Sequence, residues 1–95
     1  MTGTRRSSEG LDAKRRKLLF RSWHRGMREL DLIFGRFADA EIAGFTDEEI
    51  EHYERLLDLP ETDLFAWAVG GAAIPEQHRS PLLERILVFR RAATF

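Results

Sequence analysis

The apolar positions of this chain recur mostly at spacings of three and four, the period of an α-helix that buries one face. Glycine, proline and capping residues separate these stretches. No stretch alternates apolar and polar residues with period two for long enough to form a strand. The pattern therefore predicts an all-α protein, a compact antiparallel bundle of five helices joined by short loops.

Each predicted helix has a start or stop signal, such as the capping box formed by Thr46 and Glu49. In order, the helices run from Asp12 to about Trp23, from near Gly26 to about Ala40, from Thr46 toward Pro60, from Glu61 to about Val69, and from Ser80-Pro81 to the arginines Arg90 and Arg91. Pro60 either ends the third helix or, as we favour, leads into the fourth. The residues predicted to face the core are Leu18, Leu19, Ser22, Trp23, Met27, Leu30, Ile33, Phe34, Phe37, Ile50, Tyr53, Leu56, Leu57, Leu64, Phe65, Trp67, Ala68, Leu82, Leu83, Ile86, Leu87 and Phe89. For Trp23 a second interpretation is equally open, an exposed aromatic residue through which the chain self-associates.

Length and composition restrict the class of protein. A chain of 95 residues makes one small domain, and 43% hydrophobic with 33% charged residues is typical of a folded globular protein. The absence of cysteine excludes disulfides, thiolate metal ligands and cysteine nucleophiles. The apolar runs are too short for a membrane span, so we expect no membrane insertion. We assign residues 1–12 to a flexible basic N-terminal extension and residues 13–95 to a single helical domain.

The extension also bears on localisation. It is basic and contains serine, as mitochondrial transit peptides do, but it includes Glu9 and Asp12, and transit peptides are poor in acidic residues. We therefore expect a bacterial protein of the cytoplasm.

The net charge of −1 conceals a polarised distribution. Residues 1–28 hold nine Lys or Arg and two acidic residues, whereas residues 29–63 hold two Arg and twelve acidic residues. Separated charge of this kind can steer a protein partner over roughly 8 to 10 Å at physiological salt. For the acidic stretch taken alone, a solvated face is an equally good interpretation.

Candidate catalytic and metal-binding residues are few. Glu49 and His52 have the Glu-x-x-His spacing of di-iron bundles, but neither of the other two histidines follows a glutamate by three residues. Ser22 and His24 stand two apart on a helix and so do not face each other. The chain has no nucleophile elbow, phosphate loop or dinucleotide fingerprint. We predict no catalytic residue, no metal site and no enzymatic activity.

The segment from Arg25 to Asp31 is the strongest candidate for a functional surface. A helix stop needs only Gly26, and an exposed pair of Arg25 and Glu29 one turn apart would add only some tenths of a kcal/mol. A glycine lets the backbone of a partner come close, and the charged neighbours offer oriented donors and acceptors. We predict that Arg25, Gly26 and Glu29 face outward, while Met27 and Leu30 anchor the backbone to the core.

At these residues the chain resembles a known family, the SdhE-type succinate dehydrogenase assembly factors, whose hallmark is an RGxxE motif. The motif reads here as Arg25-Gly26-Met27-Arg28-Glu29. The stretches Arg15–Ser22 and Leu30–Ile33 flank it, and Asp63-Leu64-Phe65-Ala66-Trp67 is similar to a later Asp-Leu-x-x-Trp element of the family. Matched blocks in order make the resemblance specific, and the residues before Arg15 have no clear family counterpart.

The resemblance implies a five-helix domain that binds the flavoprotein subunit of succinate dehydrogenase, and in some bacteria that of fumarate reductase. It implies an assembly chaperone that promotes covalent attachment of FAD to a histidine of that partner. Such a chaperone is not an enzyme and holds no cofactor stably, because FAD is handled on the partner protein. By carry-over, the partner-binding residues would be Arg25, Gly26 and Glu29, supported by Met27, Arg28 and Asp31.

Two other classes of function are open on the residues alone. A generic helical regulator of the antitoxin type would capture a different partner. Nucleic-acid binding through the basic residues among positions 1–17 would be sensitive to salt. The rest of the chain is acidic and carries no recognition motif, so we predict no nucleic-acid partner.

Overall fold

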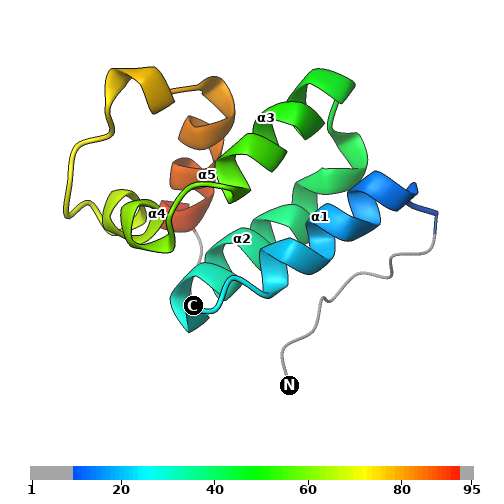
Figure 1. The fold of residues 1–95 in the computed structure, drawn as a ribbon, viewed down its shortest axis with the longest axis horizontal. Coiled ribbons are helices and arrows are strands. Elements are labelled where there is room, and N and C mark those ends of the chain that lie inside the picture. Colours follow the sequence, from blue (N-terminus) through cyan, green and yellow to red (C-terminus); the bar gives the residue numbers. More distant parts are fainter. Residues whose placement is uncertain (1–9, 93–95) are drawn as a thin grey trace.

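The computed structural model describes residues 10–92, which form five α-helices and two short 3-10 helices (Figure 1). The elements are α1 (Ala13–Trp23), α2 (Arg28–Glu41), η1 (Ile42–Gly44), α3 (Asp47–Leu57), α4 (Glu61–Ala68), η2 (Glu76–His78) and α5 (Pro81–Ala92). Within residues 10–92 no strand forms, and the prediction of an all-α, five-helix bundle is confirmed. Residues 1–9 of the predicted extension lie outside the described part of the chain.

Helices α1 and α2 form a hairpin and lie side by side along their length (Figure 1). The indole of Trp23 packs directly on Gly35, where a Cβ atom would lie only 2.3 Å from the indole ring. Its Nε1 donates to Oδ1 of Asp39, 3.2 Å away. Trp23 is 5% exposed, so it is a core residue and not the exposed aromatic that the sequence also allowed.

The centre of the bundle combines aromatic rings with a pair of buried hydroxyl groups. The ring of Tyr53 on α3 lies 6.4 Å from that of Phe34 and 6.2 Å from that of Phe37, measured between centroids. Its hydroxyl lies 2.6 Å from Oγ of Ser22, which donates to the carbonyl of Leu18. Burial raises the pKa of the Tyr53 phenol, so the group stays protonated. The hydroxyl pair therefore joins α1 to α3 without leaving either group unsatisfied.

Five residues predicted to be buried lie half-exposed at the rim of the core: Met27, Phe65, Ala68, Leu87 and Phe89. Helix α4 has only eight residues, and α5 packs on α2 and α3 from one side, so neither helix is covered all round.

The boundary of the N-terminal extension also differs from the prediction. Leu11 is buried although it was assigned to the extension, and Asp12 caps α1. The packed part of the chain thus includes Leu11.

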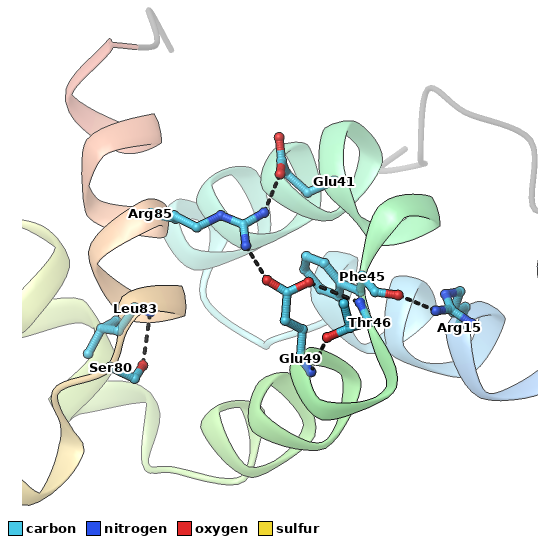
Figure 2. A network of polar contacts seen from close by, with 8 residues as sticks. All are labelled: Arg15, Glu41, Phe45, Thr46, Glu49, Ser80, Leu83 and Arg85. Carbon is cyan, nitrogen blue, oxygen red and sulfur yellow. Dashed lines mark hydrogen bonds and ion pairs between the residues drawn. The ribbon is translucent and has the colours of Figure 1, made fainter.

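The helix starts form by local chemistry, and one of them is tied to a distant helix. Thr46 and Glu49 make the predicted capping box at the start of α3. The same Glu49 carboxylate accepts from the guanidinium of Arg85 on α5, which also binds Glu41 at the end of α2 (Figure 2). Arg85 therefore links three helices.

We expect Gly35→Ala to destabilise the domain by about 1–3 kcal/mol, because the added methyl group must displace the Trp23 indole from a filled core. Urea unfolding followed by tryptophan fluorescence measures the effect. Gly44→Ala is the matched control, since a Cβ at position 44 meets nothing within 4 Å. Equal unfolding free energies for the two variants would contradict the packing described here.

Glu49 also predicts how stability depends on pH. The Thr46 backbone N–H and the Arg85 guanidinium lower the pKa of Glu49 from its ordinary value of 4.5, despite partial burial. Because the pKa is lower in the folded state, the ionised group stabilises the fold above about pH 4.5, and this contribution is lost as pH falls through the folded pKa. We expect the unfolding free energy of Glu49→Gln to fall less steeply between about pH 5 and pH 3 than that of the unaltered chain. Glu51→Gln, on an exposed position of α3, should keep the original steepness, and three parallel curves would contradict the prediction.

Candidate functional site

The segment from Arg25 to Asp31 makes the turn between α1 and α2. Helix α1 ends at Trp23, as predicted. Helix α2 begins at Arg28, two residues after Gly26, near which the sequence placed its start. The reason is the backbone of Gly26, whose φ of +93° is a conformation that residues with a side chain rarely adopt. A Cβ at this position would meet no atom within 4 Å, so the glycine is required by conformation and its surface is open.

Arg25 lies inside this turn. Its side chain is 5% exposed, and its Nη2 donates to Oε1 of Glu61 at a distance of 2.9 Å. Its backbone N–H donates to the carboxylate of Asp31 on α2. Burial lowers the pKa of the Arg25 guanidinium and Glu61 opposes that effect, but an arginine stays charged at any physiological pH. Arg25 and Asp31 thus hold the turn from within.

The prediction that Arg25 faces outward is therefore wrong, and its guanidinium pairs with Glu61 and not with Glu29, the pair that helical spacing would have allowed. The error has a physical origin, because the pair was placed on a continuous helix and the turn at Gly26 takes Arg25 out of α2. The guanidinium instead reaches Glu61, the first residue of α4, where a carboxylate is also favoured by the helix dipole.

A second ion pair braces the same region. Nη2 of Arg21, one turn before Arg25, lies 2.7 Å from Oδ1 of Asp58 at the end of α3. Asp58 and Glu61 flank the short connection between α3 and α4. The end of α1 and the turn after it therefore present two arginines, Arg21 and Arg25, that bind the two ends of this connection. Sequence reasoning missed Arg21, Asp58 and Glu61, because each ion pair joins residues about 36 positions apart and no local spacing signals it.

The outer face of the turn consists of Gly26, Arg28 and Glu29, which are all exposed. Gly26 and Glu29 thus face outward as predicted. Met27 and Asp31 are half-buried, and Leu30 is fully buried. Met27 packs against the core, which agrees with the predicted anchoring role of Met27 and Leu30. Of the six predicted partner-binding residues, three are thus available to a partner and three support the turn.

Other candidate groups are occupied by structural contacts. Ser22 is buried and bonded to Leu18 and Tyr53, and Glu49 serves the capping box and Arg85. Among residues 10–92, no three His, Cys, Asp or Glu side chains come together in an arrangement that could hold a metal ion. None of the helices in the same range has both the length and the apolar run needed to cross a bilayer.

The fold and the braced turn define a small all-α domain whose most distinctive surface is the junction between its first two helices. Residues 16–90 match the protein family described as the flavinator of succinate dehydrogenase, Sdh5, so the chain belongs to this family.

Curated relatives carry consistent names. The chain is 42% identical over 85 residues to "Succinate dehydrogenase assembly factor 2, mitochondrial" of Debaryomyces hansenii, covering 86% of this chain and 60% of the relative. It is 36% identical over 81 residues to "FAD assembly factor SdhE" of Acetobacter pasteurianus, covering 85% of this chain and 74% of the relative. A relative of the first name from Yarrowia lipolytica is 39% identical over 85 residues, covering 85% and 59% respectively. The chain thus spans about 60% of the length of the two yeast relatives.

We predict that Arg25→Ala lowers the unfolding free energy by about 1–3 kcal/mol, because it removes a buried charge-assisted hydrogen bond and the packing of the side chain. Arg79→Ala is the control, since Arg79 and Glu84 form an exposed pair at 3.5 Å that should contribute less than about 1 kcal/mol. A double-mutant cycle of Arg25→Ala with Glu61→Gln, measured by urea unfolding, isolates the pair. A coupling energy near zero would show that Arg25 does not brace the turn through Glu61.

Proposed function

We propose that this chain is an assembly factor that binds the flavoprotein subunit of succinate dehydrogenase and promotes covalent attachment of FAD to it. The observation that carries the proposal is the family match over residues 16–90. The names of the relatives, which refer to succinate dehydrogenase assembly and to FAD assembly, support it.

The contact with the flavoprotein is made by the outer face of the turn. Gly26 presents bare backbone, and Arg28 and Glu29 beside it offer a donor and an acceptor at exposed positions. Because Arg25 and Asp31 fix the turn from within, this face is already ordered before binding and little conformational entropy is lost on association. Arg25 and Asp31 act as positioning residues, and Met27 packs against the core and anchors the turn.

The chain supplies order and no reacting group. Covalent attachment of a flavin requires the acceptor histidine and the reactive flavin carbon to be aligned, and the negative charge that develops on the ring to be stabilised. Both are tasks of positioning and electrostatics that the flavoprotein can perform once a bound partner holds it in the competent conformation. In this proposal FAD stays on the flavoprotein, and the present chain is not itself an enzyme.

The flavoprotein of fumarate reductase can be tested as a second client in the same assay. The predicted location in the bacterial cytoplasm stays a prediction, since relatives named as mitochondrial and a bacterial one match alike.

The test is flavinylation of the purified flavoprotein subunit with FAD and this chain, followed as in-gel flavin fluorescence. We expect Gly26→Arg and Glu29→Ala each to reduce covalent flavin at least about tenfold, the loss expected when a central contact residue is altered. Glu48→Ala is the matched control, because Glu48 is exposed at the second position of α3 as Glu29 is at the second position of α2. Undiminished covalent flavin with both Gly26→Arg and Glu29→Ala would overturn the proposed site.

A further inference from the structure

One aromatic side chain lies on the surface directly before the turn. Phe20 of α1 is 63% exposed, whereas every other aromatic residue between positions 10 and 92 is buried or half-buried. An isolated exposed apolar residue needs no explanation by itself, so the question is whether its surroundings are organised.

The ring of Phe20 is held in place by His24. The two rings are stacked with their centroids 4.0 Å apart and an interplanar angle of 15°. Nδ1 of His24 lies 2.7 Å from the Phe20 carbonyl oxygen, which can only accept, so Nδ1 carries the hydrogen. This carbonyl is one of the last four of α1, which lack partners within the helix. The histidine therefore caps the end of α1 and supports the aromatic ring at the same time.

The position of the pair on α1 keeps it away from the core. Lys17, Phe20 and His24 follow one another at spacings of three and four, so they share one face of the helix. The buried residues of α1 occupy the opposite face: Leu18, Leu19, Ser22 and Trp23. All three residues of the outer face are exposed, and His24 is followed at once by the turn. The face therefore lies next to the turn along the chain.

The charge of this face indicates the chemistry of what covers it. Lys17 places a cation one turn from the ring, on a helix that has five Lys or Arg and no acidic residue. An acidic segment would be attracted, and an apolar or aromatic side chain within it could pack on the Phe20 ring. One aromatic residue and one cation cover much less than the roughly 800 Å² per partner of a stable interface, so this face extends a larger contact and does not form one alone.

We propose that Lys17, Phe20 and His24 form a second contact for the flavoprotein beside the turn, and that they bind an acidic segment of it that carries an apolar or aromatic side chain. This inference rests on the proposed function. The turn offers backbone and hydrogen-bonding groups, whereas the second contact offers an aromatic surface.

The experiment is the dissociation constant of the full chain with the FAD-free flavoprotein subunit, measured by calorimetry. Phe20→Ala should weaken binding about tenfold or more, as truncation of a central aromatic contact does. Val88→Ala is the control, because Val88 is 54% exposed on α5, and it should change binding less than about twofold. Thermal unfolding of Phe20→Ala should match that of the unaltered chain, since the ring is outside the core.

Charge reversal tests the second half of the proposal. Lys17→Glu should weaken binding more at low salt than at high salt. Arg55→Glu changes the net charge equally at an exposed position of α3 and should weaken binding less than Lys17→Glu does.

Unchanged affinity of Phe20→Ala for the flavoprotein, with tight binding by the unaltered chain, would overturn this inference and leave the proposed function intact. Self-association of the chain that depends on Phe20, with unchanged flavoprotein binding, would overturn it as well. Failure of the unaltered chain to bind would overturn both.

Discussion

The approach of α1 to α2 at Gly35 sets the geometry on which the rest of the domain depends. Because position 35 has no side chain, the Trp23 indole can lie flat on the backbone of α2 and fix the spacing of the hairpin. That spacing brings the last turn of α1 to the connection between α3 and α4, where Arg21 and Arg25 find Asp58 and Glu61. It also places the hydroxyl of Ser22 against Tyr53 at the centre of the bundle. A glycine in a helix costs about 1 kcal/mol relative to alanine, and here the close packing offsets that cost.

The turn between α1 and α2 divides its residues between two tasks. The side chains that could lock the backbone, those of Arg25 and Asp31, point inward to partners within the domain. The groups left outside are the bare backbone at Gly26 and the charges of Arg28 and Glu29. A binding surface built in this way is rigid without being crowded. This division suits a protein whose proposed task is to impose a conformation on a larger partner, because a soft surface would adapt to the partner instead.

Most of the fold could be predicted because its signals are local. The caps at Asp12, Thr46 and Ser80 involve residues only three positions apart, and the apolar stripes needed no knowledge of what they pack on. The site was harder for the same reason. Arg25 and Glu61 are 36 residues apart, and no periodicity shows that a charged residue beside a glycine turns inward. The resemblance pointed to this segment, but only the tertiary contacts separate its inward-facing residues from its exposed ones.

The carboxylate of Glu49 has a consequence for how the domain opens. It closes the first turn of α3 and at the same time receives the guanidinium of Arg85, which holds α5 against α2 (Figure 2). If α5 detaches, the first turn of α3 loses the cation that keeps its capping side chain in place, and if that turn frays, α5 loses one of its anchors. Through Arg85, the end of α2, the start of α3 and α5 are therefore coupled in local opening. Loosening of the C-terminal helix would thus reach α2, the helix that begins at the proposed binding face.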